Sequence, residues 1–249
     1  MHVNRELYKY LRPDGIDVLA SMRLKISSPA GFNDPFEFVP LFTSPRSDVL
    51  ADGAIRIGWP PDTAKKFSAL LSEAWGGEET AYLQAFHQKM INDAYGVICL
   101  SGKNDNLLMW AHYADNHRGF CIGFDFSKEP IPLDVSSVTY SNDRPELDTE
   151  AMMKGLPQED RARRVIFTKS KDWEYEDEFR AFVGNLPVQR PVFYFLTPLC
   201  VQSIILGLRS ETELESRIRQ ILNGPEFAHV CLFRATMHAS KFALELVAQ

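Results

Sequence analysis

Hydrophobic residues alternate with polar or small ones over several short stretches of this chain, which is the period expected of β-strands. Strands are predicted over residues 24–27 and 134–140 and in GVICLS, FCIGFDF, EFRAFV, PVFYF, VQSIILGL, HVCLFRA and FALELV. In FCIGFDF, one side of the strand holds Phe120, Ile122, Phe124 and Phe126. That aromatic side predicts a strand with one face in the core.

A period of three to four residues replaces the alternation elsewhere and predicts helices. It is clearest over 63–94, where two helices that pack together are expected on either side of Gly76 and Gly77. Others are expected near 18–22, from about 106, over 148–165 and over 211–222. Because strands and helices do not alternate regularly, we predict an α+β fold. It is a single domain over 1–249, with a mixed, mostly antiparallel sheet flanked by helices and a helical insertion at about 63–94.

Composition and charge narrow the classes of protein. A chain of 249 residues with 45% hydrophobic content can bury a sizeable core. Its 27 Lys and Arg against 33 Asp and Glu lack the basic excess of a dedicated nucleic-acid binder. No apolar run approaches the ~20 residues that cross a bilayer, and the start lacks a signal-peptide profile. We therefore expect a cytoplasmic protein with no membrane partner.

Cysteines and histidines do not predict a metal site. The four cysteines each lie in or beside an apolar run, without a CxxC pair, so buried thiols are expected at Cys99, Cys121, Cys200 and Cys231. His112 and His117 are five residues apart, and no HExxH motif is present. The glycine-rich phosphate-binding motifs are missing too.

The first candidate site combines Tyr8 and Lys9 with the turn Asn33-Asp34-Pro35. Pro35 restricts the residue before it to extended geometry, and Asn side chains bond local backbone, so a rigid polar corner is expected. This corner lines a ligand cleft with Tyr8 or Lys9 opposite it, or else Asn33 and Asp34 only cap the turn.

The second candidate is a helix that is capped by Asn104 or Asp105 and ends at Gly119. Its apolar stripe is expected to comprise Leu107, Trp110, Ala111 and Ala114, and a second face Met109, His112, Tyr113 and Asn116. Trp110 and Tyr113 are candidate ligand contacts, and His112 is a candidate general base or ribose contact. The alternative is that His112 is an ordinary surface histidine.

The third candidate is the acidic stretch 171–183. In an extended chain, Glu176, Glu178 and Arg180 point to the same side, with neighbours about 6.6 Å apart. Two carboxylates so spaced can stabilise a cationic sugar transition state, while Arg180 pairs with Glu178 or binds a phosphate. The alternative is an edge strand with solvated charges.

Four stretches in the same order, LYKY, FNDPFE, LMWAHYADNHRGFCIGFD and WEYEDEFR, resemble the bacterial domain-of-unknown-function family 2971. The layout is more distantly similar to ADP-ribosyltransferase folds. That similarity implies that Glu178 binds the nicotinamide ribose of NAD and stabilises the oxocarbenium ion, and that Glu176 orients the acceptor. It implies Tyr8 or Lys9 as the first-strand contact, although no serine-threonine-serine triplet marks the middle strand.

Three functions follow as hypotheses. The first is ADP-ribosyl transfer or NAD glycohydrolase activity, with NAD as substrate and a protein or nucleic acid as acceptor, in a bacterial toxin or antiviral defence effector. The second is a sensor or interaction module that binds a nucleotide or peptide without reaction. The third is a hydrolase or nuclease that uses His112 with Asp34 and Glu37.

Overall fold

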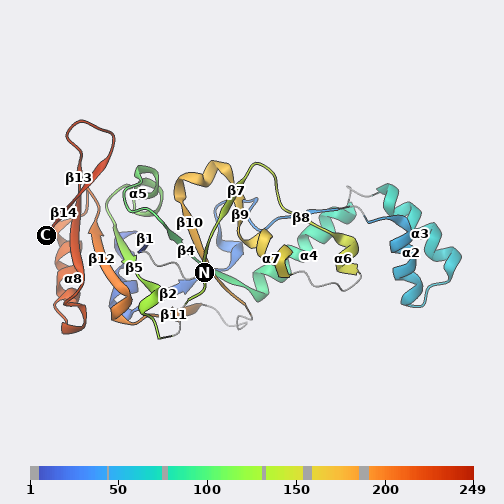
Figure 1. Ribbon diagram of the computed structural model, residues 1–249, viewed down its shortest axis with the longest axis horizontal. Coiled ribbons are helices and arrows are strands. Elements are labelled where there is room, and N and C mark those ends of the chain that lie inside the picture. The colour runs from blue at the N-terminus through green and yellow to red at the C-terminus, as the bar shows by residue number, and fades with distance from the viewer. Residues whose placement is uncertain (1–5, 44, 75–77, 131–132, 154–158, 185–190) are drawn as a thin grey trace. The chain divides into compact units, whose positions relative to one another are not determined.

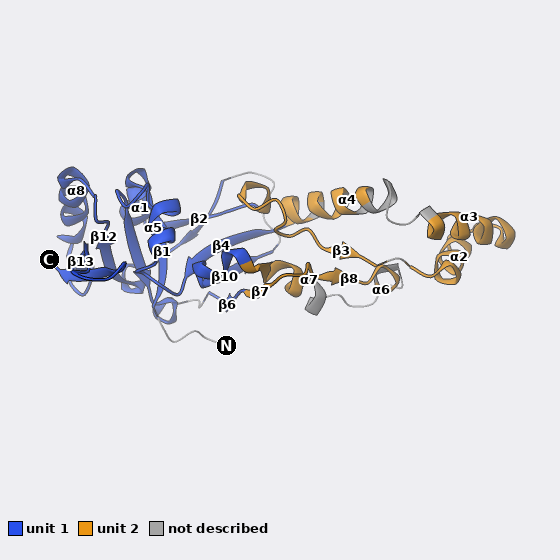
Figure 2. Ribbon diagram, turned by 90° about the horizontal axis from the view of Figure 1, so that it is seen from above, with its two compact units in different colours: residues 1–28, 95–138, 172–249 blue, residues 29–94, 139–171 orange. Residues whose placement is uncertain are grey.

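The computed structural model describes residues 6–43, 45–74, 78–130, 133–153, 159–184 and 191–249. The chain divides into two compact units, coloured in Figure 2. Unit 1 comprises residues 1–28, 95–138 and 172–249, and unit 2 comprises 29–94 and 139–171. The predicted helical insertion lies within unit 2, and the single domain stays a prediction.

Unit 1 is built on an eight-stranded sheet in the order β14-β13-β12-β5-β1-β4-β10-β6 (Figure 1). Its strands are β1 (Leu7–Leu11), β4 (Gly96–Ser101), β5 (Phe120–Phe124), β6 (Val135–Ser137), β10 (Glu178–Val183), β12 (Val201–Leu206), β13 (Cys231–Met237) and β14 (Leu244–Ala248). Neighbours run antiparallel except β12 and β13, which are parallel. The predicted α+β class and mostly antiparallel sheet are confirmed.

Helices and short elements complete unit 1. They are α1 (Asp17–Ser21), α5 (Leu107–Tyr113), α8 (Thr212–Leu222), the 3-10 turns η1 (Pro13–Ile16), η3 (Phe126–Lys128), η4 (Lys171–Glu176), η5 (Pro198–Cys200) and η6 (Pro225–Phe227), and a ribbon of β2 (Arg23–Ile26) with β11 (Val192–Phe195). The predicted helix over 211–222 and the strand over 24–27 therefore form within one residue of their expected limits.

The sheet is covered on both faces, because every residue of β5 is buried. Phe120, Ile122 and Phe124 join the larger core together with Leu214 and Ile218 of α8. On the other face, Cys121 joins a smaller core that contains Tyr10, Trp110 and Ile205. The predicted aromatic core face is confirmed, and the opposite side of the strand is buried too.

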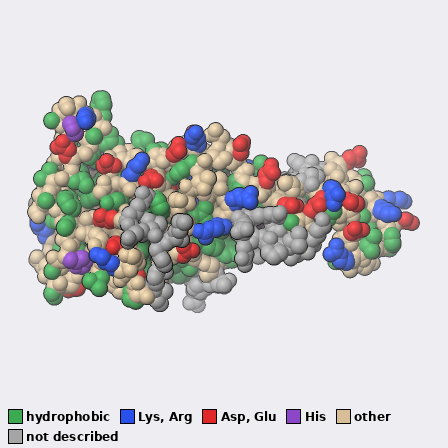
Figure 3. All heavy atoms as spheres, in the orientation of Figure 1, with side chains coloured by type: hydrophobic (Ala, Val, Ile, Leu, Met, Phe, Trp, Pro, Cys, Tyr) green, Lys and Arg blue, Asp and Glu red, His purple; other side chains and the backbone are tan. Residues whose placement is uncertain are grey.

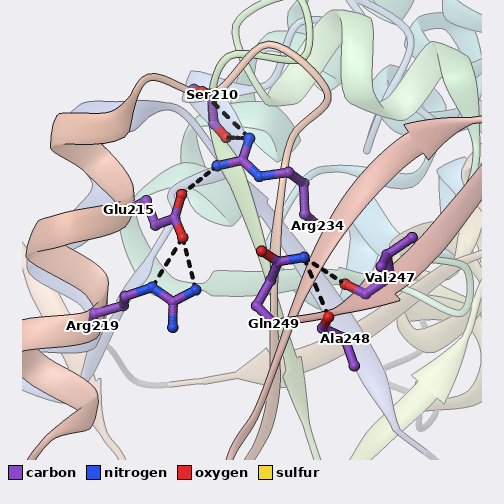
Figure 4. A network of polar contacts seen from close by, with 7 residues as sticks. All are labelled: Ser210, Glu215, Arg219, Arg234, Val247, Ala248 and Gln249. Atoms are coloured by element: carbon purple, nitrogen blue, oxygen red, sulfur yellow. Dashed lines mark hydrogen bonds and ion pairs between the residues drawn. The ribbon is translucent and has the colours of Figure 1, made fainter.

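A network of charged side chains holds α8 against β13 (Figure 4). Glu215 accepts hydrogen bonds from Arg219 at 2.8 Å and from Arg234 of β13 at 2.6 Å. The hydrogen bonds from Arg219, followed by that from Arg234, lower the pKa of Glu215. At the end of β14, the side-chain amide of Gln249 donates to the carbonyl oxygens of Val247 and Ala248.

Unit 2 is mainly helical. It contains α2 (Ser47–Arg56), α3 (Pro61–Ala74), α4 (Glu78–Ala94), α6 (Thr149–Met153), α7 (Glu159–Ile166) and η2 (Pro29–Gly31), and the parallel pairs β3 (Leu41–Phe42) with β8 (Glu146–Leu147) and β7 (Thr139–Ser141) with β9 (Thr168–Ser170). The two helices predicted over 63–94 are present as α3 and α4. The helix that packs along α3 is α2, which the hydrophobic pattern did not predict.

Cysteine burial differs from the expectation at one position. Cys121 and Cys200 are buried and Cys99 is partly buried, but Cys231 is exposed, so the prediction of a buried thiol is wrong there. Cys231 is the first residue of β13, and its side chain lies outside both core clusters.

No helix among the described residues is long and apolar enough to span a bilayer. On the face drawn in Figure 3, acidic and basic side chains are interspersed.

Candidate functional site

Three neighbouring strands of unit 1 place Tyr8, Ser101 and Glu178 in one row. Tyr8 of β1 faces Ser101 of β4, and Ser101 faces Glu178 of β10. Residues that face each other in antiparallel strands lie on the same side of the sheet, and strands are about 4.8 Å apart. The backbones at Tyr8 and Glu178 are therefore about 10 Å apart. We call these three residues the polar row.

Arg180 binds the carboxylate at the end of the polar row through two parallel hydrogen bonds. Its Nε donates to Oε1 of Glu178 at 2.8 Å, and its Nη2 donates to Oε2 at 2.9 Å. Arg180 is fully buried and Glu178 is 4% exposed. The forked geometry fixes the direction of the carboxylate. The attraction between the two opposite charges offsets the free-energy cost of burying them.

Glu176 does not continue the strand, so its predicted alignment with Glu178 in an extended chain is wrong. It ends the 3-10 turn η4, and Asp177 has a left-handed φ of 43° that turns the chain before β10 begins. The Glu176 side chain accepts a hydrogen bond from the hydroxyl of Tyr113 at 2.6 Å. Its carbonyl oxygen accepts one from the hydroxyl of Ser101 at 2.6 Å. Glu176 is thus tied to both α5 and the polar row.

The strand that carries Glu178 is not an edge strand. β10 pairs with β4 on one side and with β6 on the other. Four successive residues from Glu178 to Ala181 are buried, so both faces of this part of the strand are covered. The alternative of solvated charges on an edge is therefore corrected: the charges here are enclosed and paired.

Asn106 caps helix α5, instead of the predicted Asn104 or Asp105. Its Oδ1 accepts from the backbone N–H groups of Leu108 and Met109, and its Nδ2 donates to the carbonyl oxygen of Tyr175 at 2.9 Å. One side chain therefore satisfies the start of the helix and also joins it to η4. This bond fixes Tyr113 and Glu176 relative to each other.

Helix α5 ends at Tyr113, not at Gly119 as predicted. Asp115, Asn116 and His117 follow with left-handed φ values of 49°, 54° and 69°. Asn116 therefore does not share a helical face with His112. Gly119 serves a different purpose, because a Cβ atom there would overlap the carbonyl oxygen of Leu11.

The aromatic residues of α5 divide between the core and the surface. Trp110 is fully buried, its Nε1 donates to the carbonyl oxygen of Asn104 at 2.8 Å, and its ring meets Tyr10 edge-on. His112 is exposed, with its ring centroid 6.1 Å from that of Tyr175. The structure thus places His112 beside the aromatic end of η4 and Trp110 in the core. Leu107, predicted on the apolar stripe, is exposed instead.

Of the two first-strand candidates, Tyr8 lies in the polar row and Lys9 points to the other side of β1. The ammonium group of Lys9 donates to the carbonyl oxygen of Cys99 at 2.8 Å. The Tyr8 hydroxyl donates to Oε2 of Glu6 at 3.1 Å. Burial, followed by the charge of Glu6, raises the pKa of the Tyr8 phenol, so Tyr8 is a neutral group at physiological pH.

The polar corner around Asn33 and Asp34 belongs to unit 2. Oδ1 of the buried Asp34 accepts the backbone N–H of Phe36 at 2.8 Å, while Asn33 is exposed. Glu37, one turn further on, forms a buried ion pair with Lys169 at 3.6 Å. The predicted turn is confirmed, with Asp34 capping it, and the cleft opposite Tyr8 or Lys9 stays a prediction.

Comparison with known families supports the resemblance over part of the chain. The family model described as "Protein of unknown function (DUF2971)" matches residues 109–181. That range includes α5 from Met109 onward, all of β5 and the Glu178–Arg180 pair. No curated protein and no solved structure matches the chain. Among the described residues, no group of three or more His, Cys, Asp or Glu side chains is placed to hold a metal ion.

Proposed function

We propose that this protein breaks the glycosidic bond of NAD and transfers the ADP-ribosyl group to an acceptor or to water. The observation that carries the proposal is the polar row: Tyr8, Ser101 and Glu178 lie side by side on three neighbouring strands. An early, a middle and a late strand of the chain thus contribute neighbouring side chains to one row, as the distant similarity to ADP-ribosyltransferases implies.

Glu178 is the group we assign to the transition state. When the bond between C1′ of the ribose and the nicotinamide nitrogen breaks, its electron pair leaves with nicotinamide and positive charge develops on the ribose. A carboxylate beside that ribose stabilises the charge and accepts a hydrogen bond from a hydroxyl group. Arg180 binds both oxygens of the Glu178 carboxylate and fixes its direction. Arg180 is then a positioning residue.

The second carboxylate has a different role in this proposal. Glu176 lies just before the start of β10, where its side chain accepts a hydrogen bond from the Tyr113 hydroxyl. From there it orients the nucleophile, an acceptor group or water, which bonds to C1′ and releases its proton to the solvent. The exposed ring of His112 and the neighbouring ring of Tyr175 offer stacking surfaces for a base.

The experiment is to incubate the protein with NAD and to measure nicotinamide release, together with Glu178→Gln. We expect release by the wild type and a fall in kcat of about 100- to 1000-fold in the variant. Glu226→Gln, at an exposed position in η6, is the matched control. NAD that raises the melting temperature without releasing nicotinamide would support a non-catalytic nucleotide-binding module instead. Failure to bind NAD at millimolar concentration would overturn the proposal.

A further inference from the structure

The carboxylate of Glu6 lies on the same side of the sheet as the polar row. Glu6, just before β1, accepts hydrogen bonds from the hydroxyl groups of Ser203 and Tyr8. It lies over the backbone of β5 at Gly123, where a Cβ atom would overlap both Glu6 and Ser203. The glycine therefore makes the room that the carboxylate occupies.

The pairing of the strands gives the position of Glu6 relative to Glu178. Ser203 of β12 faces Gly123, and Gly123 faces Tyr8, so these residues extend the polar row by two strands. Gly123 and Glu178 are three strand spacings apart, which is about 14 Å. The extended row thus has one carboxylate above Gly123 and another at Glu178.

The two carboxylates have different surroundings. Glu178 is buried and bound by a guanidinium group. Glu6 is only partly buried, and its hydrogen-bond partners among the described residues are two neutral hydroxyl groups. A partly exposed carboxylate of this kind accepts hydrogen bonds from ligand hydroxyl groups and repels ligand anions.

We infer that Glu6 binds the hydroxyl groups of the second ribose, on the adenosine half of the dinucleotide, and thereby selects NAD over NADP. This inference rests on the proposed function. A dinucleotide carries hydroxyl donors on two riboses separated by a diphosphate, which suits two separated carboxylates. An acidic side chain favours a free 2′-hydroxyl, whereas the 2′-phosphate of NADP is repelled by it.

The test compares NAD with NADP, measured as Kd by calorimetry and as KM and kcat by nicotinamide release. We expect the wild type to prefer NAD by at least about tenfold, since one hydrogen bond to a charged group is worth roughly that factor. Glu6→Gln should raise KM for NAD, lower KM for NADP and leave kcat for NAD within about twofold, because Glu6 is remote from the bond that breaks. Glu226→Gln should retain the wild-type preference.

Each outcome separates the inference from the proposed function. Equal affinity of the wild type for NAD and NADP, or an unchanged preference in Glu6→Gln, would overturn the role of Glu6 while leaving NAD turnover intact. Binding of neither dinucleotide would overturn both. Gly123→Ala provides a second variant that keeps the charge but displaces the carboxylate, and it should shift the preference in the same direction. Melting temperatures establish that the variants are folded.

Discussion

Among the described residues, each unit of this protein contains a buried acid–base pair, and these two pairs differ in geometry and surroundings. In unit 1, Arg180 meets Glu178 through two hydrogen bonds of 2.8 and 2.9 Å on β10, a strand paired on both sides. In unit 2, Lys169 of β9 meets Glu37 at 3.6 Å. Lysine is a point charge, whereas arginine matches both carboxylate oxygens. Both carboxylates are buried, so burial does not separate them; the proposed role of Glu178 rests on the neighbouring hydroxyl groups of the polar row.

The largest change in the free energy of unfolding is expected for Arg180→Met. The substitution leaves Glu178 buried without its cation, which should lower the free energy of unfolding by about 3–5 kcal/mol in urea denaturation. Arg219→Met, at the more exposed pair with Glu215, should cost no more than about 1 kcal/mol. An Arg180 variant as stable as the Arg219 variant would show that the Glu178 pair contributes little.

Lys169→Met tests the buried ion pair of unit 2 in the same way. It also removes a cation from beside a buried carboxylate, but the contact it removes is longer, so we expect a loss of free energy of unfolding nearer the low end of that range, about 3 kcal/mol. The kcat of nicotinamide release should remain that of the wild type, because Lys169 lies outside the polar row. A fall in kcat without a matching loss of stability would mean that unit 2 contributes to the reaction.

A smaller effect is expected at His117, whose charged neighbour is Arg209. Burial, followed by the charge of Arg209, lowers the pKa of His117 below its usual value of 6.5. The unfolded chain then binds the proton more readily than the folded chain. The contribution of His117 to the free energy of unfolding is therefore fully present above pH 6.5 and is lost as the pH falls below that value. Melting temperatures at pH 7.5 and 5.5 should differ more for the wild type than for His117→Gln. Equal differences would contradict this assignment.

Local patterns in the sequence predicted most elements of the fold. Alternation located β4, β5 and β10 because the side-chain period of a strand is a local property. It could not predict that β4 lies between β1 and β10, since that arrangement depends on residues about 90 positions apart. Helix α5 was predicted too long, because Asp, Asn and His adopt left-handed φ more readily than most residues but do not require it, as at Asp115 to His117.

The candidate site could be predicted in part. The acidic stretch predicted Glu178 and Arg180 as candidate site residues. It did not predict the turn at Asp177 that separates Glu176 from the strand, because aspartate adopts left-handed φ without requiring it. Ser101 and Glu6 were missed. One signal was available for Glu6: a glycine inside the otherwise apolar strand β5 indicates that another group approaches the backbone closely, and at Gly123 that group is Glu6.

The measurement that tests the account most directly is the kcat of nicotinamide release from NAD by Glu178→Gln, compared with the wild type and Lys169→Met. The account predicts a loss of about two to three orders of magnitude in the first variant and wild-type turnover in the second. Equal kcat in Glu178→Gln and the wild type would show that the carboxylate at the end of the polar row takes no part in the reaction.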